Sequence, residues 1–515
     1  MNCRIFKIIN SLILIVCTML SQSCRDKWNE HYKDEPSRVT DVRLAKYIRS
    51  VAELSKFSQM ITIAGYDSIL NASQTYTVWA PNNDALQNVD LNDLALVSDI
   101  VKNHITRFSN PTSGVQSVYV KMLNGKLIRF FHDDSGFHLG RALITSPDKL
   151  AANGIVHIMD NYVPFQSNIW EYINRNNGFD SLKAYINTQH KKVFDLNGSS
   201  AVSIDSLGNR IYDSVFFENN VLFNRIGSLD LEDSVYTAIL PDNTAWNEAY
   251  NRVKPYFVSN NPTEGAAIQR SYTQFSIVRD MVFRHRISTP TSYDSLVSTT
   301  GNVFHQPAYL FNGLPATEVS NGLVYATSQM QYKAIDSWFG RIKVEAERSS
   351  GRTNSNSSIY LRYSYGSSLD VSNKGYIVVE PTTTSTISKV YVDFSIPNTL
   401  SAKYNIYCVF VPGSIVDPND LLPYRAIFYL VTLNNGKVVQ TQPLNVPGNV
   451  TDPNGITKML VAEGFKLPNC DLSLDGSRNS SPNIRLRVQN DVSVQETTLS
   501  RTMRIDYIVF EPVAE

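Results

Sequence analysis

Two hydrophobic patterns divide the chain. At residues 42–54, and again at 169–173, apolar side chains follow the period of an amphipathic helix. From residue 341 onward, apolar and polar residues alternate in short runs between Gly, Pro, Asn and Ser turns, as in β-strands. The predicted strands of this last third are residues 341–347, 358–363, 376–379, 389–394, 404–410, 427–431, 484–488 and 503–510. The pattern predicts mixed helix and strand first, followed by an all-β sandwich or jelly roll.

The first 23 residues are predicted to be a removable targeting segment. Arg4 and Lys7 precede an apolar run at 8–20. This run is shorter than the roughly 20 residues of a transmembrane helix and fits a secretory signal. Small residues stand directly before Cys24, which resembles a bacterial lipobox. The resemblance implies cleavage before Cys24, a lipid on its thiol and a polar tether at 24–38. An ordinary signal peptide with a chance cysteine is the alternative.

Three short motifs follow in order between residues 39 and 165. Residues 76–86 read YTVWAPNNDAL, a strand that Pro81 ends, and Asn83 or Asp84 is expected to cap a following helix. An Asn-His pair comes next, and then an Asn-Gly turn that leads into a second strand. The residues of this set are Tyr76, Thr77, Pro81, Asn83, Asp84, His104, Asn153, Gly154 and His157.

This ordered set resembles the fasciclin-like (FAS1) domain, a family linked to adhesion and binding. The resemblance implies a compact module of β-sandwich and helices over residues 39–165. The family's partner-binding residues differ between members, so none is assigned here. We expect His104 and His157 to hydrogen-bond the backbone across the core, with a direct binding role as the alternative.

The same motifs return in residues 166–330, which predicts a second, more diverged copy. The repeated residues are Tyr236, Thr237, Pro241, Asn243, His285, Asn321 and Gly322. His285 is expected at the place of His104, and Tyr325 replaces His157. Residues 190–232 are rich in Asn, Asp and Ser and are interpreted as an inserted loop or hairpin.

The last third, residues 331–515, is similar in its first and last strands to galactose-binding-like jelly rolls, which include many carbohydrate-binding modules. Its aromatic residues are candidates for a platform that stacks against sugars, although strand aromatics usually lie in the core. The candidate glycan-stacking residues are Trp338, Tyr363, Tyr365 and Tyr424.

Two further features of this region bear on disulfides and metals. Cys408 and Cys470 are the only cysteines after Cys24, and they form either one disulfide or two buried thiols. Asp471 and Asp475 are spaced as alternating oxygen ligands before a Gly, a weak calcium candidate with a polar turn as the alternative. No other cofactor or metal is expected.

Charge and known catalytic motifs restrict the function. The chain has 47 Lys and Arg against 47 Asp and Glu, which excludes a nucleic-acid binder driven by a basic field. The sequence contains no HExxH, no GxSxG, no phosphate loop and no dinucleotide fingerprint. No catalytic residue is assigned. The polar cluster from His132 to His138 is interpreted as a hairpin turn.

Asp-Ser followed by an aliphatic residue occurs six times before residue 300. The triplet resembles the O-glycosylation acceptor of Bacteroidota, although Asp-Ser is also an ordinary turn or helix-cap pair. The resemblance implies glycans on Ser68, Ser181, Ser206, Ser214, Ser234 and Ser295.

Together these features resemble the fasciclin-domain lipoproteins of Bacteroidota. The predicted fold class is α+β: two tandem fasciclin-like modules followed by an all-β jelly-roll sandwich. The predicted protein is a non-catalytic lipoprotein of the outer membrane, exposed at the cell surface. It is expected to bind a glycan or a protein beside a TonB-dependent transporter and its partner lipoprotein. The alternatives are a free-standing adhesion lipoprotein and, less favoured, a glycan-active enzyme.

Overall fold

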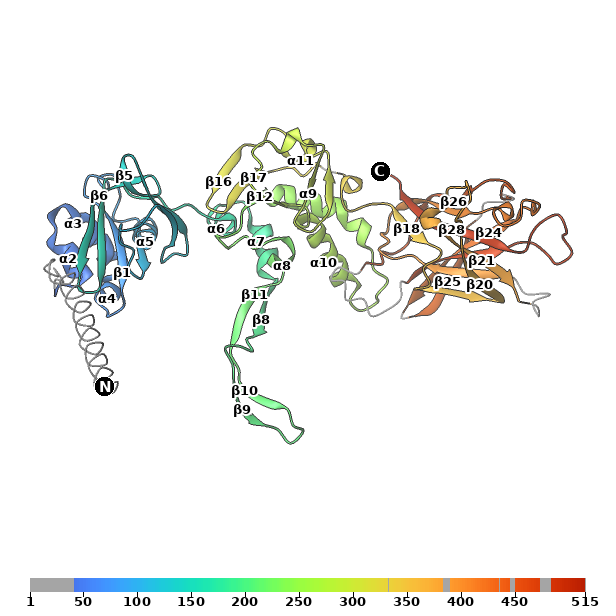
Figure 1. Cartoon of the computed structure of the whole chain (residues 1–515), viewed down its shortest axis with the longest axis horizontal. Helices are drawn as coiled ribbons and strands as arrows, with labels where there is room; N and C mark the ends of the chain where they lie inside the picture. Colours follow the sequence, from blue (N-terminus) through green and yellow to red (C-terminus); the bar gives the residue numbers. More distant parts are fainter. Residues whose placement is uncertain are drawn as a thin grey trace, which may run out of the picture. The chain divides into compact units, whose positions relative to one another are not determined.

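The computed structural model describes residues 41–331, 333–382, 390–434, 436–444, 450–472 and 483–514. The chain divides into two compact units, with the boundary between Gln166 and Ser167 (Figure 1). The predictions for the signal segment, Cys24 and the tether lie outside the described residues. Among the described residues, no helix combines the length and the apolar character needed to span a bilayer.

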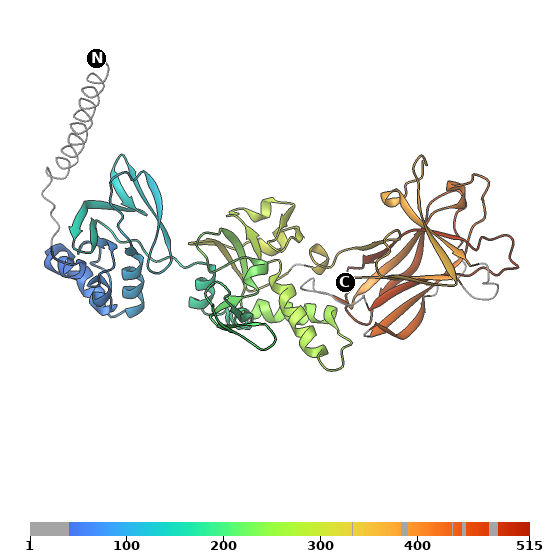
Figure 2. The same ribbon diagram turned by 60° about the horizontal axis from the view of Figure 1, so that its bottom comes forward.

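The N-terminal unit places helices on one side of a mixed sheet (Figure 2). Its helices are α2 (Leu44–Ser50), η1 (Ala52–Leu54), α3 (Ser55–Ile63), α4 (Asp67–Leu70) and α5 (Leu94–Asn103). Its strands are β1 (Tyr76–Pro81), β2 (Ile105–Arg107), β3 (Ser117–Lys121), β4 (Leu127–Asp133), β5 (Gly136–Leu139), β6 (Ala142–Ala151) and β7 (Gly154–Met159). The sheet order is β2-β1-β7-β6-β5-β4-β3, with β1 parallel to β7.

Amphipathic patterning accounts for this arrangement. Leu44, Phe57 and Val97 of three helices share one core with Val78 of β1 and Val156 of β7. The helix predicted across 42–54 is interrupted, because Val51 has an extended backbone (φ −94°, ψ 113°) between α2 and η1.

The C-terminal unit begins with a second mixture of helices and strands at residues 167–330. The helices are α6 (Ile169–Arg175), α7 (Asp180–Asn187), α8 (Phe223–Ile226), α9 (Asn243–Val253), η2 (Lys254–Phe257), α10 (Gly265–Val278), η3 (Pro290–Ser292) and α11 (Ala308–Phe311). The strands are β12 (Tyr236–Pro241), β13 (Val282–Arg284), β14 (Ser295–Val297), β15 (Val303–His305), β16 (Ala316–Val319) and β17 (Gly322–Thr327).

The sheet of this segment repeats the central pairing of the N-terminal unit. Its order is β13-β12-β17-β16. Tyr236 faces Gly322 in a parallel pair, as Tyr76 faces Gly154 in the first unit. The antiparallel neighbours β2 and β13 have matching registers, with Tyr76 opposite Arg107 and Tyr236 opposite Arg284.

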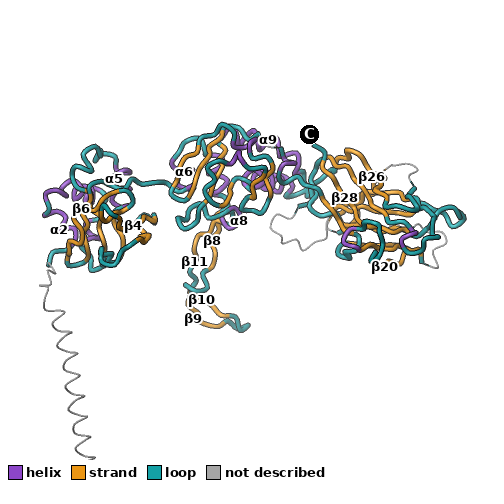
Figure 3. Tube along the Cα trace, turned by 45° about the horizontal axis from the view of Figure 1, so that its top comes forward, coloured by secondary structure: helices purple, strands orange, loops and turns teal. Residues whose placement is uncertain are grey.

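The predicted insertion is a long two-stranded hairpin, which we call the arm. It consists of β8 (His190–Phe194) paired with β11 (Phe216–Asn220), and of β9 (Ser200–Ile204) paired with β10 (Arg210–Asp213). The arm projects from the rest of its unit (Figures 1 and 3). It is shorter than the predicted 190–232, because Phe223, Ile226 and Leu229 are buried in the core.

The last part of the chain is a sandwich of two antiparallel sheets. Its elements are η4 (Ala334–Asp336), β18 (Ile342–Glu345), β19 (Arg352–Ser355), β20 (Ser357–Tyr363), η5 (Ser372–Lys374), β21 (Gly375–Pro381), β22 (Tyr391–Ser395), β23 (Lys403–Phe410), η6 (Gly413–Ile415), β24 (Ala426–Asn434), β25 (Lys437–Leu444), β26 (Thr457–Lys466), β27 (Ile484–Asn490) and β28 (Met503–Pro512). One sheet runs β20-β21-β28-β23-β26, with β18 also on β28, and the other runs β19-β22-β27-β24-β25. Alternating residues of both sheets fill one core, as for Ile406 and Leu486.

This sandwich and the preceding segment share a continuous core. The ring of Phe339 lies 5.4 Å from that of Tyr256 and 5.3 Å from that of Tyr404. The backbone N–H of Ser401 donates to the carbonyl of Tyr256 at 2.9 Å. The hydroxyl of Tyr272 donates to the carbonyl of Leu472 at 2.7 Å.

Candidate functional site

The two motif asparagines are buried backbone clamps. Asn153 accepts from Leu44 N and donates to the carbonyls of Leu70 and Ala72, each at 2.9 Å. Its amide thereby ties the start of α2 and the end of α4 to the turn before β7.

Asn321 makes the same three bonds in the second segment. It accepts from Ile169 N at 2.9 Å and donates to the carbonyls of Leu229 and Leu231 at 2.9 and 3.0 Å. The two asparagines therefore have equivalent structural roles, and both are committed to backbone groups.

Each motif glycine admits its parallel neighbour strand. A Cβ on Gly154 would lie 1.9 Å from the carbonyl oxygen of Tyr76, and one on Gly322 would lie 1.8 Å from that of Tyr236. Their φ values of +153° and +152° also favour glycine. At the other end of these ladders, Pro81 faces Met159 and Pro241 faces Thr327.

The motif threonines fasten a left-handed residue after the short strands β2 and β13. Thr77 Oγ1 donates to the carbonyl of Phe108 at 2.9 Å, and Thr237 Oγ1 donates to that of His285 at 2.8 Å. Phe108 and His285 both have a φ of 70°. The prediction that His285 corresponds to His104 is therefore wrong, because His285 is the exposed counterpart of Phe108.

Met281 stands in place of His104. Its carbonyl accepts from Ile239 N at 2.9 Å, just as the carbonyl of His104 accepts from Trp79 N at 2.9 Å. The two histidines are easily confused in the sequence, because His104 directly precedes β2 and His285 directly follows the equivalent strand β13.

The two motif histidines of the first unit, His104 and His157, use both ring nitrogens for the backbone. His104 Nδ1 donates to Ile100 O at 2.7 Å, and its Nε2 accepts from Val163 N at 2.9 Å. Burial lowers its pKa to about 4, so the ring is neutral at pH 7.

His157 has a similar role, and Tyr325 takes its place in the second segment. His157 Nε2 donates to Asn110 O at 3.0 Å, and burial lowers its pKa. The hydroxyl of Tyr325 reaches the carbonyls of Ile287 and Ser288 at 3.0 and 3.1 Å. Because their polar atoms bond to backbone groups, these side chains have a structural role.

The cap predicted at Asn83 or Asp84 is instead Asn82, and the equivalent Asp242 caps the helix of the second segment. Asn82 Oδ1 accepts from Ala85 N at 2.8 Å, and Asp242 caps α9 through Ala245 N at 2.9 Å. Residues 83–88 form turns rather than the predicted helix, and Asp84 is exposed.

Asn83 and Asn243 instead reach back to the start of an earlier helix. Asn83 Oδ1 accepts from Lys56 N and Asn243 Oδ1 accepts from Ser181 N, both at 2.9 Å. These amides join the strand-to-helix corner to α3 and α7.

Two of the four candidate stacking aromatics pack within the protein. Tyr424 is 1% exposed, and its hydroxyl donates to the carbonyls of Val411 and Arg504 at 3.0 and 2.8 Å. Trp338 packs edge-on against Tyr256, with ring centroids 5.3 Å apart. The prediction for Tyr424 is wrong, because its ring fills the core. Trp338 is half-buried at the edge of the same core.

Tyr363 and Tyr365 form an exposed stacked pair. Their ring centroids are 5.4 Å apart at an interplanar angle of 20°, and their exposed fractions are 55% and 77%. They border an open hollow of about 500 Å³ whose other lining is mostly hydroxyl and amide groups. The remaining lining residues are Ser364, Gly366, Ser367, Ser368, Leu369, Ser414, Ile415 and Asn454.

A small separate core holds the three loops around this hollow. Val371 of the Tyr365 loop, Ile415 of η6 and Ile456 pack on the outer side of β21 at Tyr376 and Val378. The hollow is therefore lined by loops that a rigid strand scaffold holds in place, as binding sites usually are. Sequence reasoning missed Ser414 and Asn454, since nothing in the local pattern brings them to Tyr363.

Carboxylates hold the far end of the Tyr365 loop. Ser372 N donates to Asp506 Oδ2 at 3.1 Å, Ser372 Oγ donates to Glu345 at 3.0 Å, and Asn373 donates to Glu347 at 3.1 Å. Burial, with the nearby charges of Glu345 and Glu347, raises the pKa of Asp506 to about 7. Across the described residues, no set of three or more His, Cys, Asp or Glu side chains is arranged to hold a metal.

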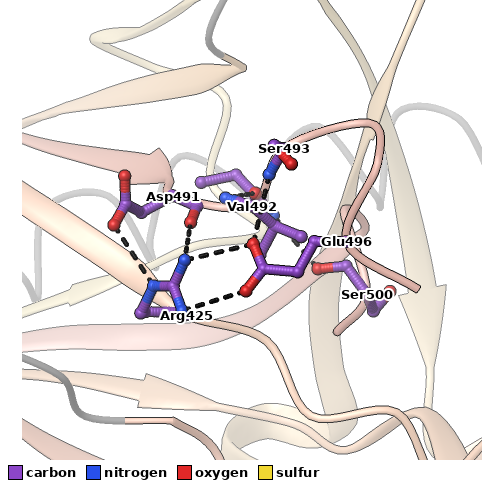
Figure 4. A network of polar contacts seen from close by, with 7 residues as sticks. Arg425, Asp491, Val492, Ser493, Glu496 and Ser500 are labelled. Atoms are coloured by element: carbon purple, nitrogen blue, oxygen red, sulfur yellow. Dashed lines mark hydrogen bonds and ion pairs between the residues drawn. The ribbon is translucent and has the colours of Figure 1, made fainter. Parts of the chain in front are cut away.

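Arg425 locks a neighbouring loop to the sandwich (Figure 4). Its guanidinium contacts both oxygens of Glu496 at 3.2 Å and Asp491 Oδ2 at 3.2 Å. The charges in this network are paired internally, which assigns it a structural role.

The structure describes both candidate cysteines and one of the two candidate calcium ligands. Of the two predicted alternatives, the structure has two thiols rather than a disulfide at Cys408 and Cys470, and Cys470 is half-buried. Cys408 is wholly buried in β23, and burial raises the pKa of its thiol. The carboxylate of Asp471 accepts from Asn483 N at 2.6 Å, whereas Asp475 lies outside the described residues.

The polar cluster from His132 to His138 lies at the hairpin between β4 and β5, as predicted. Ser135 Oγ and Asp133 Oδ1 both meet Nε2 of His138, at 2.8 and 3.1 Å. In a catalytic triad the acid and the nucleophile contact different nitrogens of the histidine ring, so this cluster does not have the geometry of a triad.

Of the six candidate glycosylation serines, four are exposed and two are half-buried. The exposed ones are Ser68, Ser206, Ser214 and Ser295, and the half-buried ones are Ser181 and Ser234.

Comparison with known proteins identifies one domain. Residues 52–163 match the fasciclin domain. A search of curated proteins finds no match.

Three solved structures show weak likeness. A FAS1 domain pair from the insect cell adhesion molecule fasciclin I is 14% identical, covering 55% of this chain and 98% of that chain, with a TM-score of 0.21. A family 35 carbohydrate binding module from Clostridium thermocellum is 9% identical, with coverages of 34% and 98% and a TM-score of 0.19. A mannan-recognising carbohydrate-binding module is 10% identical, with coverages of 33% and 96% and a TM-score of 0.19. These scores define neither fold nor function.

Proposed function

We propose that this chain is a non-catalytic binding protein whose C-terminal sandwich binds a glycan at the hollow beside Tyr363 and Tyr365. The observation that carries the proposal is the exposed, parallel tyrosine pair at the rim of a hydroxyl-lined hollow. An aromatic face packs against the C–H face of a sugar ring, while serine and asparagine side chains exchange hydrogen bonds with its hydroxyls. The hollow is open, which suits a chain end or a branch of a polysaccharide.

A glycan microarray probed with the full chain tests this proposal. The bound oligosaccharide is then titrated by calorimetry against Tyr365→Ala, Tyr363→Ala and Tyr360→Ala. We expect each of the first two to weaken binding by about five- to thirtyfold, because losing one stacking ring costs about 1–2 kcal/mol.

Tyr360 is the matched control. It lies on the same strand and is 41% exposed, but it does not line the hollow. Tyr360→Ala should bind as the unsubstituted chain does. A blank array, or equal losses in all three variants, would count against the proposal.

We infer an architecture of two tandem fasciclin-like modules followed by a jelly roll. The matched clamps of Asn153 and Asn321 support the first part of this inference. The two packed antiparallel sheets support the second part.

We also propose that Cys24 carries a lipid in the outer membrane and that the protein faces outward beside a TonB-dependent transporter and its partner lipoprotein. The lipobox-like segment supports the anchor. Affinity purification of the tagged chain from solubilised outer membrane, read by mass spectrometry, should recover the transporter pair in stoichiometric amounts. An empty purification would refute the transporter association.

The fasciclin match at residues 52–163 favours a second candidate, a free-standing adhesion lipoprotein. Deleting the gene would then reduce attachment to cells or matrix, and a chain with Tyr365→Ala would restore it. The glycan proposal predicts that this variant fails to restore glycan capture.

A further inference from the structure

The hollow beside Tyr363 and Tyr365 offers uncharged chemistry to a ligand. Among the described residues that line it, none is Lys, Arg, His, Asp or Glu. Its polar groups are the hydroxyls of four serines and two tyrosines and the side-chain amide of Asn454. A charged ligand group would lose its water here without meeting an opposite charge, which is costly. The lining therefore suits an uncharged ligand.

The loops around the hollow add negative charge. They span residues 363–371, 411–421 and 450–457, all of which the structure describes, and they contain four aspartates and no Lys or Arg. Asp420 is paired with Arg504 at 3.0 Å, whereas the other three aspartates are exposed. Exposed charges act over about 8 Å, one Debye length at physiological salt. These carboxylates disfavour a glycan that carries carboxylate or sulfate groups.

Asn454 presents an unused amide to the hollow. It is exposed, and its side chain forms no hydrogen bond within the part of the chain that the structure describes. An amide carries an acceptor oxygen and a donor nitrogen side by side. It can therefore accept a hydrogen bond from one sugar hydroxyl and donate one to the neighbouring hydroxyl.

The loop that carries Asn454 is held in place by its own hydrogen bonds. Asn454 N donates to Asp452 Oδ1, and Asp452 N donates to Thr457 Oγ1, both at 2.8 Å. Ser414 Oγ, from η6, donates to the carbonyl of Pro453 at 2.8 Å. Because the loop is already ordered, a ligand bound to Asn454 does not have to order it, which saves binding free energy.

We propose that the hollow selects an uncharged glycan, and that Asn454 is a specificity-determining residue that binds two adjacent hydroxyls of one sugar. The C–H face of this sugar packs on the exposed tyrosine pair, and its neighbouring hydroxyls meet the Asn454 amide. Glycans with carboxylate or sulfate groups are rejected, because the described lining holds no cation and the surrounding loops carry exposed aspartates. This inference rests on the proposed glycan function and names the class of glycan.

A panel of neutral and acidic oligosaccharides tests the charge preference of the full chain. The neutral members are gluco-, galacto-, manno- and xylo-oligosaccharides, and the acidic members are oligogalacturonides, oligomannuronides and sulfated galactans. We expect binding only to neutral members, with an affinity that changes less than about twofold between roughly 20 and 500 mM NaCl, because salt screens only charged contacts. Preferred binding of an acidic member, or an affinity that falls with salt, would overturn this inference and leave the glycan function standing. A panel without any binding would overturn both.

Calorimetric titration of the neutral oligosaccharide that binds best tests the role of Asn454. Asn454→Ala should weaken binding by about tenfold, because two hydrogen bonds are lost together. Asn419→Ala is the matched control. Asn419 is also exposed and its backbone N–H donates to Asp417 Oδ1 at 2.9 Å in the same kind of turn, but it does not line the hollow. This variant should bind as the unsubstituted chain does.

Deoxy analogues of the bound terminal sugar distinguish recognition by Asn454 from a merely structural role. Each analogue lacks one hydroxyl, and we expect two analogues, at adjacent positions, to bind the unsubstituted chain about fivefold more weakly. The same two analogues should bind Asn454→Ala as tightly as the parent sugar does, because the partner of their missing hydroxyls is already gone. Normal binding by Asn454→Ala, or an undiminished response of this variant to both analogues, would overturn the inference.

Discussion

At the scale of single residues, most of the polar side chains of the motifs form hydrogen bonds with the backbone. Asn153 and Asn321 each form three hydrogen bonds with main-chain groups, and both ring nitrogens of His104 also bond to the main chain. Buried polar groups are costly unless they are paired. These side chains are therefore better placed to specify the fold than to meet a ligand.

Asp506 predicts a fall in stability as pH rises. Its pKa is about 7 in the folded chain against an ordinary 3.8, so between these values the folded state holds a proton that the unfolded state releases. Stability should decrease from about pH 4 to pH 7 and then level off. Asp506→Asn should remove this decrease. At pH 8 its free energy of unfolding should exceed that of the unsubstituted chain by about 1–3 kcal/mol.

Urea unfolding of the full chain at a series of pH values measures the effect. The exposed Asp370→Asn is the control and should follow the unsubstituted chain. A parallel pH profile for Asp506→Asn and the unsubstituted chain would contradict the assignment.

At the scale of elements, the parallel pair of β1 and β7 depends on the absence of a side chain. Gly154→Ala should unfold the N-terminal unit, because its Cβ would overlap the carbonyl oxygen of Tyr76 at 1.9 Å. The loss of hydrogen-exchange protection in β1 and β7 measures this effect.

Gly125→Ala is the control that distinguishes the steric overlap at Gly154 from the cost of a positive φ at an alanine. Its φ of +87° is also unfavourable for alanine, but nothing lies within 4 Å of the added Cβ. It should cost only about 1–2 kcal/mol and leave the unit folded. Similar exchange in the two variants would disprove the steric account.

Elements whose sequence lacks clean alternation were missed. Strand β25 reads KVVQTQPL and is exposed over most of its length, so no buried face marks it. Strand β26 carries register shifts against β23, which break the two-residue period. The strands of the sandwich core were placed well, because Ile406 and Leu486 alternate with less buried neighbours.

At the scale of the whole molecule, the C-terminal unit is expected to unfold as one body. Phe339 is 2% exposed and joins Tyr256 of η2 to Tyr404 of the sandwich. Phe339→Ala should cost about 3–5 kcal/mol and separate the unfolding of residues 167–330 from that of the sandwich. Hydrogen exchange in increasing denaturant, with peptides from both parts, measures the coupling.

Phe311→Ala is the matched control. Phe311 is equally buried but contacts Phe283 and Tyr325 within its own part. It should lower the stability of both parts together. Separate transitions in the unsubstituted chain would contradict the shared core.

The sequence by itself determined the fasciclin domain, the repeat of its motifs and the strand-rich last third, because these rest on local spacing and short-range turns. Tertiary structure alone decided which aromatics are exposed, since Tyr424 and Tyr365 look alike as strand or loop tyrosines. It also decided that His285 matches Phe108, because that equivalence is a matter of register. The hollow beside Tyr365 depends on which distant segments come together, and no local pattern encodes that.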